Sequence, residues 1–406
     1  MKKIFLISVL LVTIAGQAMS QGNKRDIDEN YRRSSLYSLM VSHTNSKFNK
    51  EIEQCFLKIP TPDAYNDHDL SVKVVSINRK RLGKPRNNEN GITEINEFLD
   101  RNKVASRLVA KWYDYNPYTG DMDINLISER GKYAASEIEK AKAATSVRGM
   151  DAVLSDAGED LIPNTFVLVN DITYIDRSKG SKAIGTVFKV LGTIAAVATN
   201  DDSYSDLGNS LGSIAETFKG FSVRIHTSLY QLVWTDEVQA EFYKTAWKDK
   251  DAFEKMRGKF QLKYIGEQTS SGSRTSFLGI REDQPELMIR KACQRALDEN
   301  IANLQQNFQV FQIKSPLDVE TMEAKIGKKE GITENSLFEV LERVKDENGK
   351  ITYKKIGEVK PVPNLIWDNR YMAEEEMAQG ATLGCTTFKK VKGGDFIPGC
   401  LIRQIK

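Results

Sequence analysis

The chain has 406 residues, more than one hydrophobic core usually supports, so we expect it to divide into two or three domains. It carries 58 lysines and arginines against 55 aspartates and glutamates, a balance that argues against the strongly basic surface of a nucleic-acid-binding protein. Only three histidines are present, which argues against a histidine-rich metal centre. We therefore expect a globular protein with neither a nucleic-acid partner nor a metal.

Residues 1–20 have the features of a secretory signal peptide. Lys2 and Lys3 give the positive start, Ile4–Ile14 is the apolar segment, and small residues precede a cleavage site between Ser20 and Gln21. The apolar segment is too short for a stable membrane anchor. The alternative, a buried N-terminal helix, is less favoured. The sequence therefore predicts export to the periplasm or beyond.

Residues 21–128 are expected to form an N-terminal region of mixed helices and strands. Hydrophobic spacing predicts strands over Ser35–Val41 and Leu70–Ser76, and helices over Lys47–Phe56 and Thr93–Arg107. The turn sequence Asn116–Gly120 then predicts a hairpin between Trp112–Tyr115 and Met122–Leu126.

Helices and strands alternate in a central domain, residues 129–328. The predicted helices are Tyr133–Ala144, Gly149–Ala157, Asp236–Arg257 and Pro285–Gln306. The predicted strands are Thr165–Ile175, Phe221–Thr235, Lys259–Ile265 and Phe308–Ile313. Four strands separated by helices predict an α/β or α+β layer with helices packed on the sheet.

Residues 329–406 have the pattern of a small β-barrel or sandwich. Short β segments separated by glycines are expected at Leu337–Val344, Ile351–Lys360, Cys385–Val391 and Ile397–Ile402. Met372–Gln379 is a polar helical insertion. The predicted fold class is therefore multidomain α+β, ending in a small C-terminal β-barrel.

The four cysteines show neither a C-x-x-C pair nor a zinc-ligand spacing. The first, Cys55, lies far from the cleavage site, so we expect no lipoprotein anchor. An exported protein meets oxidising conditions, and Cys385 and Cys400 lie in one compact unit. A disulfide between them would add about 3 kcal/mol of stability. The favoured alternative is that they are small buried side chains.

Ala183–Ala198 is almost wholly apolar and built of small residues, with one lysine. The favoured interpretation is a tightly packed helix; the alternatives are a membrane-inserting hairpin and an oligomer interface. Gly208–Gly212 matches the G-x-S-x-G pattern around the nucleophilic serine of some hydrolases. A polar segment precedes it where a strand is required, and no acid lies between Ser210 and the only later histidine, His226. Helix packing explains this motif better.

Asp121, Asp123 and Asn125 resemble the start of a calcium-binding loop. The pattern then fails, because Leu126 stands where glycine is required and Lys132 where glutamate is required. A solvated hairpin edge is the favoured interpretation, and we expect no metal site here.

Two further clusters have binding and structural alternatives. Arg79–Arg86 holds five positive charges, which suits a solvated loop or contact with anionic lipid, glycan or peptidoglycan. The aromatic residues Trp112, Tyr113, Tyr115 and Tyr118 suit a glycan-binding surface or, preferably, packing on a core. His43, His68 and His226 are scattered along the chain, so they indicate neither a metal site nor a catalytic triad.

Three segments carry a resemblance to known families: Arg130–Ala135 with Arg148-Gly149, Asp156–Ile162, and Thr165–Val169. Together they resemble a family of uncharacterised exported proteins of Gram-negative bacteria, a resemblance that implies no activity. The C-terminal segments 337–340, 356–360 and 396–399 resemble the SH3-like barrel of flagellar and secretion accessory proteins. The central layer is similar to their curli-secretion-like α/β domains. These likenesses imply a role in envelope assembly.

No set of residues meets the requirements of catalysis, and no nucleotide-binding fingerprint is present, so we expect neither catalytic residues nor a cofactor. The leading hypothesis is a non-catalytic exported envelope protein that binds or scaffolds an envelope protein or polysaccharide, with peripheral membrane contact. One alternative is a hydrolase of envelope polymers or glycans that uses paired carboxylates. A second is a secretion accessory protein that inserts Ala183–Ala198 into a membrane.

Overall fold

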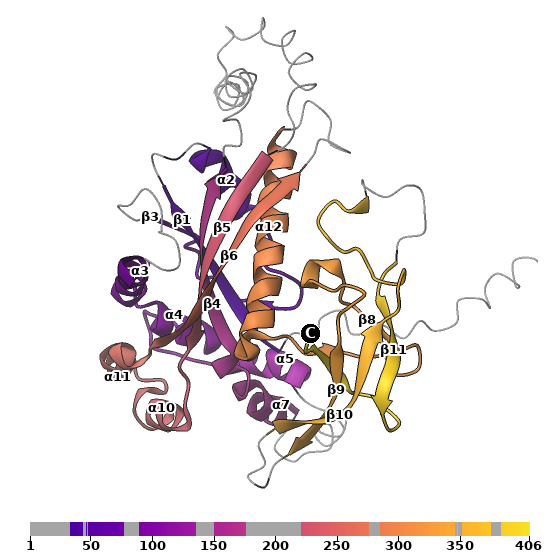
Figure 1. Ribbon diagram of the computed structural model, residues 1–406. Coiled ribbons are helices and arrows are strands. Elements are labelled where there is room, and N and C mark those ends of the chain that lie inside the picture. Colours follow the sequence, from indigo (N-terminus) through magenta and orange to yellow (C-terminus); the bar gives the residue numbers. More distant parts are fainter. Residues whose placement is uncertain are drawn as a thin grey trace, which may run out of the picture.

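The computed structural model describes residues 33–43, 46, 48–76, 89–134, 150–175, 221–275, 285–345, 347, 351–374 and 383–406. These residues form a sheet covered by helices on both faces and a smaller β unit beside it (Figure 1). Four predicted features lie outside the described residues: the signal peptide, Arg79–Arg86, Ala183–Ala198 and Gly208–Gly212.

The large sheet is mixed, with the strand order β2-β1-β4-β5-β6 and β3 beside β1. Strand β1 runs parallel to β2, β3 and β4, whereas β4, β5 and β6 are antiparallel. The strands are β1 (Ser35–Ser42), β2 (Asn66–Asp67), β3 (Val74–Ser76), β4 (Thr165–Tyr174), β5 (Phe221–Leu232) and β6 (Leu262–Thr275). The predicted helix–strand layer is thus confirmed, and β1 lies between β4 and the short edge strands β2 and β3.

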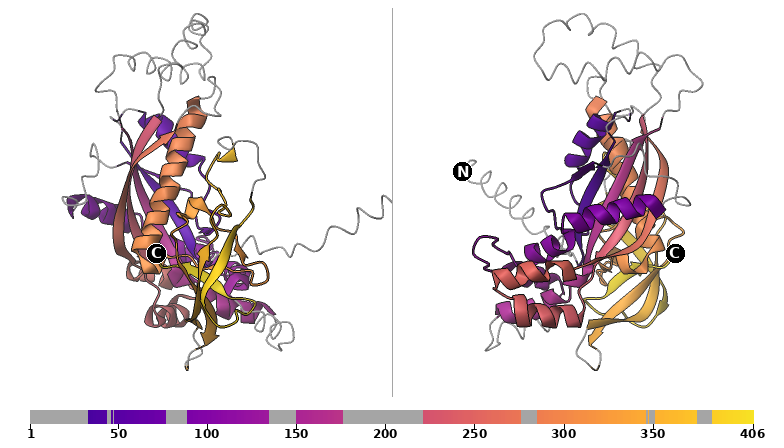
Figure 2. Two further views of the ribbon diagram at one scale, coloured as in Figure 1. Left: turned by 45° about the vertical axis from the view of Figure 1, so that its right-hand side comes forward. Right: turned by 90° about the vertical axis from the view of Figure 1, so that its left-hand side faces the viewer.

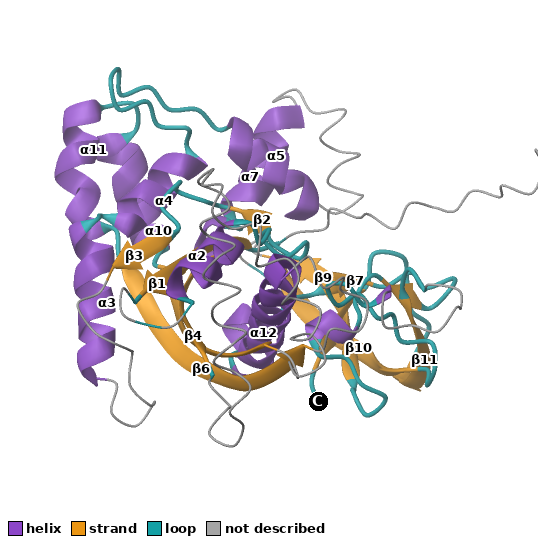
Figure 3. Cartoon of the chain, turned by 90° about the horizontal axis from the view of Figure 1, so that it is seen from above, coloured by secondary structure: helices purple, strands orange, loops and turns teal. Residues whose placement is uncertain are grey.

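Alternate side chains of the strands point to opposite faces, and each face has its own hydrophobic core. On the concave face lie α2 (Asn49–Leu57) and α12 (Pro285–Asn307), against Leu36, Met40 and Phe166 (Figure 3). The other face of the sheet presents Tyr37, Leu39 and Val167, and helices pack against these side chains. Its helices are α3 (Glu89–Arg101), α4 (Val104–Trp112), α5 (Asn125–Ala134), α7 (Met150–Glu159), α10 (Asp236–Glu241) and α11 (Lys250–Met256).

Helices α5 and α7 touch through two glycines that leave no room for a side chain. A Cβ atom on Gly131 would lie 1.8 Å from the carbonyl oxygen of Leu154. A Cβ atom on Gly158 would lie 2.0 Å from the carbonyl oxygen of Ile127. The two backbones therefore approach each other more closely than any other residue type allows.

The predicted hairpin between Trp112 and Leu126 is wrong. Trp112 ends α4, where Leu108 and Trp112 share one buried helix face, and Asn125 begins α5. The turn inside it is confirmed, because the Gly120 amide donates to the Asn116 carbonyl at 2.8 Å. Apolar spacing in this stretch fits a helix face as well as a strand, which explains the error.

Four other predicted elements differ in extent or type. The helix expected over Thr93–Arg107 breaks into α3 and α4, and the one over Asp236–Arg257 breaks at a π-helical turn, η4 (Phe242–Ala246). The strand expected over Phe308–Ile313 is instead a 3-10 turn, η6 (Gln309–Phe311). There the ring of Phe311 stacks on Tyr65, so tertiary packing decides the backbone. Strand β6 continues to Thr275 because it pairs with β5 along its whole length.

The C-terminal unit is a nearly closed, antiparallel barrel-like sheet with the order β7-β12-β9-β10-β11-β8. Its core includes Phe338, Val340, Val359, Phe388 and Ile402. The strands are β7 (Ser315–Pro316), β8 (Glu323–Ala324), β9 (Phe338–Lys345), β10 (Ile351–Pro361), β11 (Thr386–Gly393) and β12 (Leu401–Gln404). A strand is present in each of the four predicted segments, and the small β-barrel is confirmed at this level. Most of the predicted helix Met372–Gln379 lies outside the described residues.

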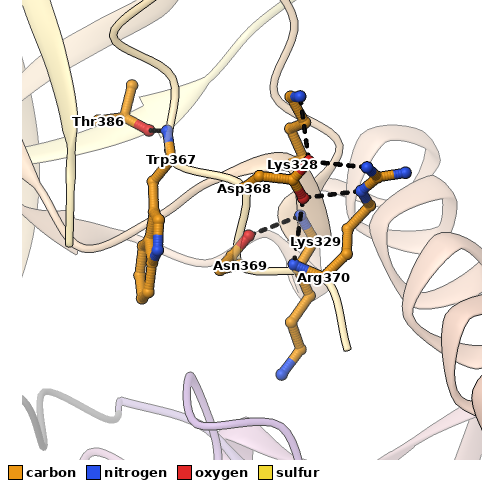
Figure 4. A network of polar contacts seen from close by, with 7 residues as sticks. All are labelled: Lys328, Lys329, Trp367, Asp368, Asn369, Arg370 and Thr386. Carbon is orange, nitrogen blue, oxygen red and sulfur yellow. Dashed lines mark hydrogen bonds and ion pairs between the residues drawn. The ribbon is translucent and has the colours of Figure 1, made fainter. Parts of the chain in front are cut away.

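The barrel lies beside the C-terminal half of α12 (Figure 2). Arg295 of α12 donates through Nε to the carbonyl of Tyr371 at 2.9 Å. The adjoining loops are tied together at Asp368, which binds Lys328 and Arg370, and at Asn369, whose Oδ1 accepts from the Lys329 amide at 2.8 Å (Figure 4). The Arg295 bond joins the barrel unit to the sheet domain, and the other contacts hold the adjoining loops to each other.

Candidate functional site

Two of the three histidines lie on the same face of the large sheet, beside the same aspartate. His43, which follows β1, has its Nε2 2.7 Å from Asp171 Oδ1, and both side chains are buried. In the register of β4 and β5, Asp171 lies directly opposite His226. His226 in turn lies 3.2 Å from Glu267 Oε2 through Nε2 and 2.7 Å from Thr269 Oγ1 through Nδ1. Two histidine–carboxylate pairs therefore stand side by side.

A carboxylate that fixes an imidazole is one requirement of general-base chemistry. A nucleophile and access for a substrate are the others. Ser228 is on the same face as His226, and its Oγ is buried without a hydrogen-bond partner among the described residues. Neither of two cavities in the described structure opens onto this cluster. The arrangement is thus a buried polar core element with the residue types of a catalytic site.

These pairings were not foreseen from the sequence. The partners His43 and Asp171 are distant in sequence, and β1 and β4 bring them together only because they are neighbouring parallel strands. No local motif marks such a pair. The histidines are scattered along the chain, as the sequence shows, but two of them share one site in the fold.

The third histidine, His68, lies in a buried polar contact that links α4, α5 and β2. Arg130 Nη1 donates to His68 Nδ1 at 2.8 Å, and the Nε2 of the same ring lies 3.0 Å from the Leu108 carbonyl. Burial, and then the charge of Arg130, lower the pKa of His68 well below its usual value. The ring is therefore neutral, with its proton on Nε2. The Arg130 guanidinium also stacks 4.4 Å from the Trp112 ring, so this buried charge joins α4, α5 and β2.

The acidic residues of the calcium-like sequence make local hydrogen bonds in the turn and at the start of α5 instead. Asp121 Oδ2 accepts from Thr119 Oγ1 at 2.5 Å, and Asp123 Oδ1 accepts from the Asn125 amide at 2.9 Å, at the start of α5. Among the described residues, no three histidine, cysteine or acidic side chains are arranged to hold a metal ion.

The aromatic residues divide between core and surface. Trp112 and Tyr113 are fully buried, and the Tyr113 ring lies 4.7 Å from the ring of Phe242. Tyr118 is 87% exposed in the turn. The expectation that this aromatic segment packs on a core is confirmed for Trp112 and Tyr113, and the four residues do not form one aromatic surface.

The structure contains no disulfide at the four cysteines. The Cys385 thiol lies 3.7 Å from Glu323 Oε2, and Cys400 is buried, which raises the pKa of its thiol. The bridge between Cys385 and Cys400, the less favoured alternative from the sequence, stays a prediction to be checked by mass spectrometry without reduction.

The barrel carries an exposed cluster of cations that we call the lysine strip. It is formed by six exposed side chains of β10 and β11: Lys354, Lys355, Lys360, Lys389, Lys390 and Lys392. Acidic residues beside them are Glu358, Asp395 and Glu342, which lies opposite Lys354 in the register of β9 and β10. Glu358 binds Lys355 at 2.7 Å and Lys392 at 2.9 Å, and these bonds lower the pKa of its carboxyl. Six cations against these three carboxylates leave the strip positive.

Apolar surface lies next to these charges. Val391 and Ile397 are 47% and 48% exposed. The ammonium group of Lys390 lies 5.0 Å from the centre of the Phe396 ring, which in turn fits against Gly357, where a Cβ atom would be 2.5 Å from the ring. The strip therefore offers both charge and apolar contact. The lysine strip is visible in the sequence as lysines repeated on two predicted strands, but such lysines usually belong to an ordinary solvated face.

The cavities themselves are small. The first, about 30 Å³, lies between α12 and the barrel, where Gln305, Glu330 and Phe338 are among its lining residues. The second, about 20 Å³, lies beside β1 and is lined in part by Phe56 and Ile301. Both have room for water molecules rather than for an organic substrate. The exposed strip is therefore the most prominent binding feature of the described residues.

Within the described ranges, every helix is too short or too polar to cross a membrane. The chain matches no protein-family model, and a comparison with curated proteins finds no relative.

Proposed function

We propose that this protein is an exported, non-catalytic envelope protein that binds an acidic partner on the lysine strip of its barrel. The observation that carries the proposal is the concentration of six exposed lysines on two neighbouring strands, where they outnumber the neighbouring carboxylates of Glu342, Glu358 and Asp395. Such a local field attracts polyanionic surfaces and raises the rate of association. Val391 and Ile397 add apolar contact area next to the charges.

The proposal includes an SH3-like barrel and a role in the assembly or scaffolding of the envelope. The resemblances in the C-terminal and central segments support this role, and the signal-peptide features of residues 1–20 support export. Fractionation of cells followed by N-terminal sequencing tests the export step. A periplasmic or secreted form that begins at Gln21 is the expected result, and a cytoplasmic form that keeps Met1 would overturn it.

The binding step is tested with polyglutamate as the acidic probe, on the full mature chain. Lys389, Lys390 and Lys392 are changed together to glutamate, and affinity is measured over a series of salt concentrations. We expect the triple variant to bind at least about tenfold more weakly, and the wild-type affinity to fall as salt rises.

The matched control changes the same number of charges on the sheet domain. Lys50, Lys244 and Lys255 are exposed on other elements, and their joint replacement by glutamate alters net charge equally. The control is expected to bind much as the wild type does. Equal loss in both variants would show that only net charge matters, and this result would overturn the proposed site.

A second candidate function is hydrolysis of an envelope polymer, favoured by the paired histidines and carboxylates around Asp171 and Glu267. It predicts release of soluble fragments from dye-labelled peptidoglycan by the wild type. This release would be lost in His226→Ala, provided that this variant keeps the wild-type circular dichroism spectrum. Absence of release by the wild type would exclude peptidoglycan hydrolysis under the conditions used.

A further inference from the structure

One edge of strand β11 has a strand partner for only its first two residues. On one side β11 pairs with β10 from Phe388 to Gly393. On its other side, β8 pairs with Thr386 and Thr387, and the Phe388 amide donates to the Met322 carbonyl at 2.7 Å. Beyond this point, no described strand lies beside residues 389–393 on that side. Alternate backbone N–H and C=O groups along this stretch therefore face outward at the edge of a sheet.

The exposed edge has features that oppose pairing with itself. Glu358 and Val359 of β10 are matched with Lys392 and Lys390, so Val391 between them is an extra residue that forms a β-bulge. Three of the four residues 389–392 are lysines. Two copies of this edge would bring lysines against lysines, which repel. The same charges favour an incoming strand of opposite sign.

The spacing between strands supports this preference for an acidic incoming strand. A strand added beside β11 would lie about 4.8 Å away, and its side chains would stand next to those of β11 on both faces. Acidic side chains would then meet Lys389, Lys390 and Lys392 directly. Apolar side chains in the same strand could contact the exposed Val391.

We propose that the acidic partner of the barrel is an extended peptide segment, rich in glutamate or aspartate, that adds to β11 as a further strand along residues 389–393. This inference rests on the proposed function and names its partner class. Backbone hydrogen bonds to the edge supply affinity, and the lysines supply the choice of an acidic sequence. An acidic polysaccharide would use the lysines alone.

The test combines binding with amide hydrogen exchange on the full mature chain. The probe is an octapeptide of alternating glutamate and valine, compared with polygalacturonate as an acidic polymer without peptide bonds. We expect the peptide to bind and to slow the exchange of backbone amides within residues 389–393 at least about tenfold. Exchange in β9, which already has strand partners on both sides, is the internal control and is expected to stay unchanged.

A second form of the peptide, N-methylated at every residue, keeps the charges and loses every backbone donor. It is expected to bind at least about tenfold more weakly. Equal binding of the methylated and unmodified peptides, or binding without slower exchange at 389–393, would overturn strand addition while leaving the lysine strip as a binding site. Polygalacturonate that binds as tightly as the peptide would also overturn strand addition and leave the lysine strip as a binding site. If neither the peptide, polyglutamate nor polygalacturonate binds, the proposed function falls with the inference.

Discussion

The buried carboxyl of Asp298 makes the stability of the protein depend on pH in a direction opposite to that of most aspartates. Asp298 lies on the side of α12 that faces the barrel, and its Oδ2 is buried without a hydrogen-bond partner among the described residues. Burial raises the pKa of Asp298 from 3.8 to about 7; Lys329 and Arg295 act in the other direction, and Glu330 and Asp63 reinforce the rise.

The sign of the effect follows from proton binding. Between pH 3.8 and about 7 the folded protein keeps the Asp298 proton, whereas the unfolded chain has lost it. The stability linked to this proton is fully present below pH 3.8 and is lost as the pH rises through about 7. Two pH units within this window correspond to about 2.7 kcal/mol.

The perturbation is Asp298→Asn, which keeps the shape of the side chain and removes the charge. We expect the variant to gain stability relative to the wild type as pH rises, so that the difference in unfolding free energy widens by about 2.3 kcal/mol from pH 5 to pH 7, because Asp298 is already half ionised at pH 7 in the folded state. Urea unfolding at pH 5, 6, 7 and 8 measures this, with equal m-values required for the comparison.

The control is Glu299→Gln, an exposed carboxyl at the next position of the same helix. A pH dependence of the same size in Glu299→Gln would show that the effect comes from the loss of one carboxylate on α12 and not from the burial of Asp298. A flat difference for Asp298→Asn would refute the reasoning, because it would mean that Asp298 titrates equally in the folded and unfolded states.

Three further predictions concern stability. Gly131→Ala should lower the unfolding free energy by about 3 kcal/mol, because its Cβ would overlap a carbonyl of α7; Gly258→Ala, where nothing lies within 4 Å, should cost less than about 1 kcal/mol in urea unfolding. Arg130→Leu should cost about 2 to 4 kcal/mol, because it leaves buried acceptors unpaired; no change in the midpoint would contradict this. Burial alone would raise the pKa of Asp368, but hydrogen bonds from Arg370 and Lys328 outweigh it and lower that pKa to about 2. The stability that these bonds provide should therefore be lost as pH falls from about 4 to 2. Asp368→Asn should therefore cost about 1 kcal/mol at pH 7 and have little effect at pH 2, and an equal cost at both values would contradict the assignment.

Elements with one dominant pattern were predictable from the sequence. Strands β1 and β4, the long helix α12 and three barrel strands were located, because alternation or helical spacing continues over their length. The fourth barrel strand, expected over Ile397–Ile402, begins only at Leu401. The errors lie where short apolar spacing fits both periods. Around Trp112 a helix satisfies the buried face, and at Phe311 a contact with Tyr65 outweighs local propensity.

The candidate sites were less accessible from the sequence. The pairing of His43 with Asp171 depends on the order of strands in a sheet, which no local pattern encodes. The lysine strip depends on β10 and β11 being neighbours and on where β8 ends. Each lysine alone is an ordinary surface residue, and only their juxtaposition in the fold makes a positive surface.

The order of strands in the barrel has a consequence for the way in which it folds. β12, the last strand in the sequence, lies between β7 and β9 and pairs with both. A chain that is synthesised from its N-terminus can form the β9–β10 hairpin early, but it cannot join β7 to β9 before residues 401–404 arrive. Until then Phe338 and Val340 lack part of their cover, so the nascent barrel exposes apolar surface. Fusion of a bulky tag directly after Gln404 would interfere with this final step, whereas a flexible spacer would leave it intact.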